Sequence, residues 1–377
     1  MAGAIASAES QKIIFERGGN LKEDAGARPW ALLGRCLGLC LAMTLVWMGT
    51  WTSARAASPG GEENMLIPVG RAVGIKLFSD GVMVVGLAQV PGEEGAETPA
   101  KDCGLRQGDI ITHINSTQVD TIEQVKEILQ DLEGEDMSIR AIRDDKQVQF
   151  TARAVQCSDG SYRLGAWIRD SMAGIGTMTY YDPESGQFAA LGHGVNDVDT
   201  AMLMPMESGG ILYASVAGVK KGESGEPGEL HGAFQSDQEL GALYANTDGG
   251  VFGTLTDESL IQGLEPVPVA ARDQVKVGPA VILSNVEGDT VEQYAVEITR
   301  LYPEGSHDTR ELTLKVTDSR LLEKTGGIVQ GMSGSPILQD GRLVGAVTHV
   351  LVNDPSSGYG ILAETMLKQG NEAAENA

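Results

Sequence analysis

The sequence predicts a mainly β protein with three parts: an apolar N-terminal segment, a small mixed α/β domain, and an all-β unit of two small barrels. Composition is the first reason, because 49 glycines and only 5% aromatic residues among 377 residues suit many short strands and turns. The second is one long apolar run near the N-terminus. The third is a C-terminal half of short apolar segments and turns that no long amphipathic helix interrupts.

The N-terminal part divides into a polar region, residues 1–29, and a predicted membrane segment, residues 30–56. Its uninterrupted apolar stretch, Cys36 to Trp51, has 16 residues. A spanning helix needs about 20, but Arg35 can extend its charge to the lipid headgroups. Because Ala54-Arg55-Ala56 has the pattern of a signal-peptidase site, the segment is either a cleaved signal or a retained anchor. Both place the rest of the chain outside the cytoplasm; a buried core helix is the less favoured alternative.

Residues 65–155 have the pattern of a small α/β domain. Val82 to Val90 is apolar enough for a buried strand, and Thr121 to Leu132 repeats apolar residues at helical spacing. Thr121 can cap this helix, with Gln124 at the capping-box position.

This domain resembles a PDZ domain. The resemblance is carried by Ala100, Gly104-Leu105, Gly108-Asp109-Ile110-Ile111, Ile114-Asn115 and the helix after them. PDZ domains bind extended peptides at a sheet edge, often with a backbone nest for a C-terminal carboxylate. The resemblance therefore implies a peptide groove beside the helix. The predicted nest consists of Val73, Gly74, Ile75, Lys76 and Leu77. The alternative is a strand with a glycine bulge.

Residues 160–366 predict the two barrels, because a unit of about 200 residues made of short strands suits this architecture. The predicted strands include Gly176 to Tyr181, Phe188 to Leu191, Ala280 to Ser284, Val291 to Leu301 and Glu311 to Val316.

The segment Gly331 to Pro336 (GMSGSP) is typical of the nucleophile turn of a trypsin-like protease. Such a turn exposes the hydroxyl of Ser333 and points the amides of Gly331 and Ser333 into one space, where they can hold an oxyanion. The dipeptide Asp340-Gly341 then predicts a hairpin turn. The alternative for this motif alone is a Gly/Ser surface turn.

A serine hydroxyl needs a histidine to accept its proton. His193 is the candidate, because Gly192 and Gly194 flank it on a turn that leaves an apolar strand. His349 lies on the strand after the nucleophile hairpin and is predicted to be a pocket wall or core residue. The carboxylate that would orient the histidine stays open at this point. The candidates are Asp197, Asp199, Asp308, Asp318 and Asp354.

Three stretches together resemble the stage IV sporulation protein B peptidase family. They are Leu191 to Gly194 with Asp197 to Thr200, Gly327 to Pro336, and Gly345 to Val350 with Asn353 to Pro355. The resemblance implies a membrane-associated serine endopeptidase with an N-terminal PDZ domain and a chymotrypsin-like double β-barrel. In that family the triad carboxylate lies in a Thr-Asp segment, which maps onto Thr317-Asp318. The implied triad is His193, Asp318 and Ser333.

The same resemblance implies a role in sporulation signalling, in the space between the two forespore membranes. The enzyme would cleave itself and a membrane-bound regulator, and an intramembrane protease would then activate a late mother-cell sigma factor. Two alternatives stay open: a PDZ adaptor with a non-catalytic protease-like domain, and a general envelope quality-control protease.

The composition argues against some classes of partner and cofactor. The chain has 28 Lys and Arg against 52 Asp and Glu, a net charge of −24 that argues against nucleic acid. Its five histidines and four cysteines show no zinc-binding spacing, so we expect no metal and no organic cofactor. Cys103 and Cys157 are expected to be separate thiols.

Overall fold

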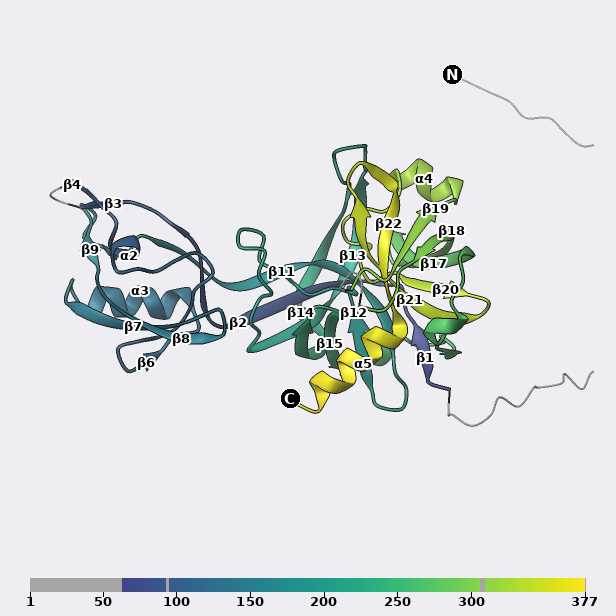
Figure 1. The fold of residues 1–377 in the computed structure, drawn as a ribbon, viewed down its shortest axis with the longest axis horizontal. Helices are drawn as coiled ribbons and strands as arrows, with labels where there is room; N and C mark the ends of the chain where they lie inside the picture. Colours follow the sequence, from purple (N-terminus) through teal and green to yellow (C-terminus); the bar gives the residue numbers. More distant parts are fainter. Residues whose placement is uncertain (1–62, 93–94, 306–308, 377) are drawn as a thin grey trace, which may run out of the picture. The chain divides into compact units, whose positions relative to one another are not determined.

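The computed structural model describes residues 63–92, 95–305 and 309–376 (Figure 1). The predicted polar region and membrane segment, residues 1–29 and 30–56, lie outside the described residues. In the part that is described, no helix combines the length and apolar character needed to cross a bilayer. The fold is mainly β, as predicted.

The first barrel is a ring of six strands that closes because β2 pairs with both β13 and β11. In order around the ring these are β11 (Ala166–Tyr181), β12 (Gln187–Ala190), β15 (Gly250–Leu255), β14 (Glu229–Thr247), β13 (Ser208–Lys220) and β2 (Ala72–Leu87). Two short strands, β1 (Met65–Pro68) and β16 (Val267–Pro268), extend the sheet beyond β11. The 3₁₀ turns η1 (Glu258–Leu260) and η2 (Arg272–Gln274) follow β15 and β16.

The second barrel is also closed by six strands. In order these are β17 (Gly278–Glu287), β18 (Thr290–Leu301), β19 (Leu312–Val316), β22 (Asp354–Leu362), β21 (Arg342–Leu351) and β20 (Pro336–Gln339). Helix α4 (Ser319–Thr325) follows β19, and α5 (Ala363–Ala374) ends the described chain. The predicted hairpin turn is confirmed, since Asp340 and Gly341 have φ of 52° and 77° between β20 and β21.

The small domain combines the end of β2 with short strands and one amphipathic helix. Its elements are β3 (Val90–Gly92), β4 (Gly95–Glu97), α2 (Pro99–Asp102), β5 (Ile110–Ile114), β6 (Thr117–Gln118), α3 (Ile122–Asp131), β7 (Asp136–Arg143), β8 (Lys146–Arg153), β9 (Val155–Gln156) and β10 (Tyr162–Arg163). The predicted capping box is confirmed, because Thr121 accepts from the Gln124 amide while the Gln124 side chain accepts from the Thr121 amide.

Strands β2 and β11 belong to both the small domain and the first barrel (Figure 1). They pair from Leu87 with Ala166 at one end to Ala72 with Thr177 at the other. The sequence analysis assigns residues 65–155 to the small domain, but β1 and the first half of β2 pair with barrel strands.

The predicted carboxylate nest is therefore wrong. The residues concerned are Val73, Gly74, Ile75, Lys76 and Leu77. All five pair with β11 on one side and β13 on the other, so their backbone offers no open sheet edge to a peptide. Gly74 serves close packing instead of a turn, because a Cβ there would lie 2.5 Å from Cβ of Phe234.

Candidate active site

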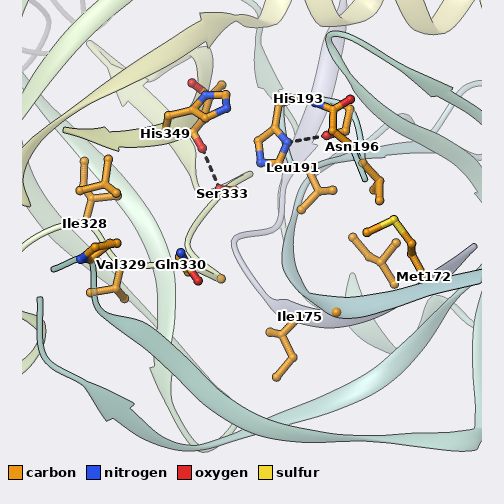
Figure 2. Close-up of a pocket in the computed structure, with 18 of the residues that line it drawn as sticks. Met172, Ile175, Leu191, His193, Asn196, Ile328, Val329, Gln330, Ser333 and His349 are labelled. Carbon is orange, nitrogen blue, oxygen red and sulfur yellow. Dashed lines mark hydrogen bonds between the residues drawn. The ribbon is translucent and has the colours of Figure 1, made fainter. Parts of the chain in front are cut away.

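Ser333 and His193 line the same cavity, which has a volume of about 460 Å³. Figure 2 shows the two side chains with His349 beside them, while Ile175, Ile328 and Val329 give the rest of the cavity apolar walls. The cavity thus brings together the predicted nucleophile and the predicted base, although 140 residues separate them in the sequence (333 − 193).

The turn that carries Ser333 requires glycine at the next position. Gly334 has a φ of 97°, and a Cβ there would lie 2.0 Å from the carbonyl oxygen of Thr177. Its amide donates to the carbonyl of Val347 at 2.7 Å. The serine turn is therefore packed directly between a strand of the first barrel and a strand of the second.

Two further hydrogen bonds orient the predicted oxyanion amides. The carbonyl of Gln330, which shares a peptide bond with the Gly331 amide, accepts from the amide of Leu230 at 2.8 Å. The carbonyl of Met332, which shares a peptide bond with the Ser333 amide, accepts from the amide of Ser335 at 2.9 Å. In a trans peptide the N–H points opposite to the C=O, so these contacts fix where both N–H groups point. Among the described residues, neither amide donates to a protein acceptor. Both stay available for an oxyanion.

Thr177 of β11 joins the turn that carries Ser333 to the turn that carries His193. Its amide donates to the carbonyl of Ser333 (2.9 Å), and its hydroxyl donates to the carbonyl of Gly331 (2.8 Å). Its own carbonyl accepts from the amide of Leu191, two residues before His193, at 3.1 Å. Because Thr177 is buried, these bonds hold both turns against the packed core.

His193 lies just beyond the end of β12, after two residues with left-handed backbone. Leu191 and Gly192 have φ of 70° and 69°, which turns the chain sharply into the cavity. Nδ1 of His193 lies 2.8 Å from the carbonyl oxygen of Gly194. Since a carbonyl can only accept, Nδ1 carries the proton and Nε2 is left as the acceptor. Burial lowers the pKa of His193, which keeps the ring neutral at neutral pH and able to act as a base.

His349 contacts the ring of His193, with 4.8 Å between the ring centroids. It lines the cavity, as predicted, but its contact with the predicted base was not foreseen. Burial, together with the charges of His193 and Arg310, lowers the pKa of His349 to about 4. The two imidazoles are thus both neutral at pH 7, and His349 does not repel the positive charge that forms on His193 during proton transfer.

The hydroxyl of Ser333 donates to the carbonyl of Thr348 at 2.7 Å. A hydroxyl in this position is exposed to the cavity but does not yet donate to His193. Proton transfer requires the hydroxyl hydrogen of Ser333 to turn away from the Thr348 carbonyl and toward Nε2 of His193.

The predicted contact between Asp318 and His193 is not what the structure shows. Asp318 is the N-cap of α4 and accepts from the amide of Arg320 at 2.9 Å. Its carboxylate also pairs with the Arg320 guanidinium (3.0 Å) and accepts from the Ala295 amide (3.3 Å). The hydrogen bonds from Arg320 hold the pKa of Asp318 below its ordinary value. This carboxylate is engaged in capping a helix, and it does not line the cavity.

The other candidate carboxylates are also engaged elsewhere. Asp197 and Asp199 pair with Arg169, and Asp354 accepts from two neighbouring serine hydroxyls. Asp308 lies outside the described residues. Within the described part of the chain, the group that fixes the tautomer of His193 is the carbonyl of Gly194.

A second cavity, of about 690 Å³, lies between α3 and the start of β11. Val125 and Leu129 of α3 form one wall, and Ala166 to Ile168 of β11 form the other. Among the described strands, β11 pairs here only with β2, so its other edge faces the cavity. This is the geometry in which a PDZ domain adds a peptide strand. The sequence signal for this groove is the Leu164-Gly165 pair before an apolar strand, and Gly165 has a φ of 78°.

No metal site is apparent in the described chain, where no three His, Cys, Asp or Glu side chains are grouped to hold an ion. Cys103 and Cys157 are both free thiols.

The models of two protein families match the chain. Residues 160–367 match the model of the SpoIVB peptidase S55 family, and residues 93–143 match a PDZ domain model. A search of curated proteins found no match.

Three solved structures illustrate what the chain is similar to. One is the PDZ domain of an SdrC-like protein from Listeria monocytogenes, with 22% identity, coverage of 24% of this chain and 87% of that chain, and a TM-score of 0.20. Another is the active form of the Rv3671c protease from M. tuberculosis, with 14% identity, 65% and 83% coverage, and a TM-score of 0.32. The HtrA-type protease AlgW with a decapeptide has 13% identity, 55% and 54% coverage, and a TM-score of 0.32.

Proposed function

Because the chain belongs to the SpoIVB peptidase S55 family and is a serine endopeptidase, we propose that it acts in sporulation signalling. In this role it cleaves itself and cuts a membrane-bound regulator, and an intramembrane protease then activates a late mother-cell sigma factor. The observation that carries the proposal is the shared cavity of Ser333 and His193, in a chain whose peptide groove can hold an extended partner.

The proposed reaction begins when Ser333 Oγ attacks the carbonyl carbon of a peptide bond. His193 Nε2 takes the hydroxyl proton, and the Gly194 carbonyl stabilises the Nδ1–H of the resulting imidazolium. The amides of Gly331 and Ser333 hold the oxyanion. When the C–N bond breaks, His193 gives its proton to the leaving amine. Water then hydrolyses the acyl-enzyme, with His193 as the base again.

We also propose that the enzyme works outside the cytoplasm, between the two forespore membranes. The support is the apolar run within residues 30–56 followed by a signal-peptidase-like pattern. The groove and cavity would then face substrates at the membrane surface.

The test uses a sporulating host that lacks its own family member. The full chain should restore expression from a reporter of the late mother-cell sigma factor and produce a shortened regulator. Ser333→Ala should restore neither, although it is made at the same level. Equal restoration by Ser333→Ala would overturn the proposal in favour of an adaptor.

A second measurement tests self-cleavage and the range of proteins that the enzyme cleaves. The purified full chain in detergent should show new N-termini by intact mass, and these should be absent in Ser333→Ala. Degradation of many unfolded proteins with no preference for the regulator would contradict the signalling role and indicate a quality-control protease.

A further inference from the structure

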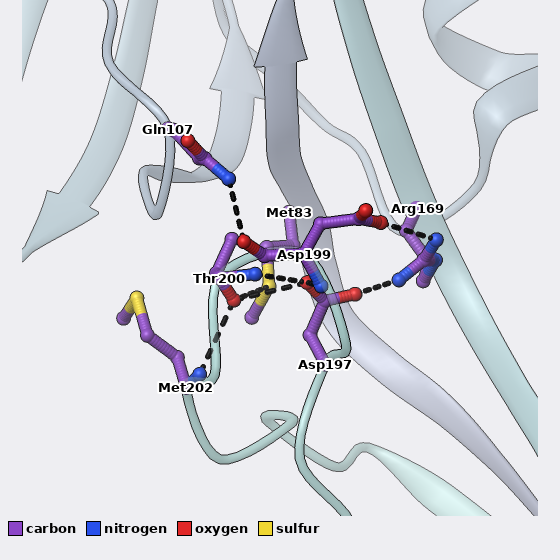
Figure 3. Close-up of polar contacts among 7 residues, drawn as sticks. All are labelled: Met83, Gln107, Arg169, Asp197, Asp199, Thr200 and Met202. Atoms are coloured by element: carbon purple, nitrogen blue, oxygen red, sulfur yellow. Dashed lines mark hydrogen bonds and ion pairs between the residues drawn. The ribbon is translucent and has the colours of Figure 1, made fainter. Parts of the chain in front are cut away.

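The loop that follows His193 is organised around one buried carboxylate. Asp197 is fully buried, and one of its oxygens accepts from the amides of Asp199 (3.0 Å) and Thr200 (2.8 Å) and from the Thr200 hydroxyl (3.0 Å). The other oxygen pairs with the guanidinium of Arg169 (Figure 3). A second nitrogen of Arg169 reaches Asp199 at 2.9 Å. Arg169 therefore compensates the charge on which the shape of this loop depends.

Arg169 comes from β11, directly after the residues that form a wall of the peptide groove. Ala166, Trp167 and Ile168 line the groove, and Trp167 is 66% exposed. The next residue after Arg169, Asp170, accepts from the amide of Ile122 at 2.9 Å. Ile122 is the first residue of α3, the opposite wall of the groove. Both walls are thus tied to β11 beside Arg169.

The ladder between β11 and β2 is irregular at this point. Its register shifts between Trp167 and Ile168 and again between Arg169 and Ser171. Bulges leave residues unpaired and allow a strand to bend without disturbing the ladder beyond them. The stretch that carries Arg169 is therefore the part of β11 that can adjust when the groove is filled.

We propose that Arg169 is a positioning residue that couples occupation of the peptide groove to the orientation of His193. An extended peptide in the groove contacts residues 166–168 and α3, and so sets the position of Arg169. Arg169 in turn sets the conformation of the loop that carries Asp197. That loop begins at Gly194, and the Gly194 carbonyl accepts the hydrogen bond from Nδ1–H of His193. Because linkage is reciprocal for binding, a groove ligand that changes the affinity of the active site for its substrate is itself bound with an affinity changed by the same factor when the active site is occupied. The inference rests on the proposed roles of Ser333 and His193.

The first experiment measures how fast a fluorophosphonate labels Ser333 in the full chain. The double variant Arg169→Met with Asp197→Asn removes the ion pair without leaving a buried charge, and the Asn oxygen can keep the three loop hydrogen bonds. We expect its labelling rate to fall about tenfold or more while its Tm stays within a few degrees of the parent.

Gln107→Ala is the matched control. The Gln107 side chain also joins the small domain to this loop, since it donates to the Asp199 carbonyl at 2.8 Å, but it carries no charge. Its labelling rate should equal the parent's. A double variant that labels at the parent's rate would overturn the positioning role.

The second experiment fills the groove with a defined group. Lys126 of α3 lines the groove, so Lys126→Cys modified with N-hexylmaleimide places an alkyl chain there. Complete modification, confirmed by intact mass, should change the labelling rate of Ser333 about fivefold or more. The change should vanish when Arg169→Met and Asp197→Asn are added. The parent treated with the same reagent controls for modification of the four native cysteines.

A fully modified protein with an unchanged rate, or an equal change in the triple variant, would overturn the coupling. A parent protein that is not labelled at Ser333 would instead overturn the proposed function.

Discussion

The turn that carries Ser333 and the loop that follows His193 border one cavity, but they are held by different kinds of contact. Ser333 and its neighbours are fixed by short main-chain hydrogen bonds to Thr177, Val347 and Leu230, which lie in the packed cores of the two barrels. The loop after His193 depends on the charge of Asp197 and on Arg169, a partly exposed side chain from the strand that continues into the peptide groove.

This difference indicates which half of the active site can be adjusted. Moving the serine turn would break buried main-chain hydrogen bonds and open gaps in two well-packed cores. The histidine loop is also held at Val195 by Asn246, but its Asp197 side depends on an ion pair beside irregular strand pairing. We therefore expect the oxyanion amides to be preorganised and the base to be the element on which regulation acts.

The largest loss of activity is expected for His193→Gln, which removes the proposed general base. We expect kcat/KM to fall by about 10³-fold or more, because the amide of glutamine cannot accept the proton of Ser333. Cleavage assays with the parent and the variant, together with Tm values, will check this. If the variant keeps more than about a tenth of the parent activity, another base is at work.

The serine half is broken most specifically by Thr177→Val. The variant keeps the shape of the side chain but removes the hydroxyl that donates to the Gly331 carbonyl. We expect a loss of about 10- to 100-fold in kcat, with KM little changed. Thr179→Val is the control, because the Thr179 hydroxyl on the same strand is buried without a hydrogen-bond partner in the described structure. An equal loss in both variants would contradict a specific role for Thr177.

The pH dependence sharpens the comparison, since both imidazoles belong to the histidine half. Their folded pKa values are lowered, that of His349 to about 4. The unfolded chain takes up protons near pH 6.5 and the folded chain does not, so the free energy of unfolding should decrease as the pH falls from about 6.5 to about 4. Denaturation at several pH values will show this. His349→Phe should weaken the dependence, and an unchanged curve would contradict the lowered pKa of His349.

The smallest effect is expected for Asp318→Ala. The structure makes Asp318 a helix cap, so the variant should lose about 1 kcal/mol of stability and keep most of its activity. Urea denaturation and kcat/KM measured side by side will separate the two effects. A loss of activity as large as that of His193→Gln would mean that Asp318 reaches His193 in the reacting conformation.

The parts predicted correctly from sequence are those with local chemical requirements. Ser333 and His193 stand on turns with special backbone angles, and those turns leave glycine signatures in the sequence. The capping box at Thr121 and the hairpin at Asp340 are equally local.

The parts that were missed depend on long-range pairing. Val73 to Leu77 contain a glycine that suits a nest, but their place is set by β11 and β13, about 100 or more residues away in sequence. Asp318 is a separate case, because its role was carried over by resemblance while its carboxylate contacts are local, to Arg320 two residues along the chain. The strand that borders the cavity beside α3, Ala166 to Ile168, lay outside the segment assigned to the small domain.

The most direct test of the account is to find the residue that a fluorophosphonate modifies. We predict one adduct per chain, located on Ser333 by peptide mass spectrometry, absent in Ser333→Ala, and formed about 100-fold or more slowly in His193→Gln. A correctly folded parent protein with no adduct on Ser333, or an adduct that forms equally fast without His193, would contradict the claim that these two residues are the reacting pair.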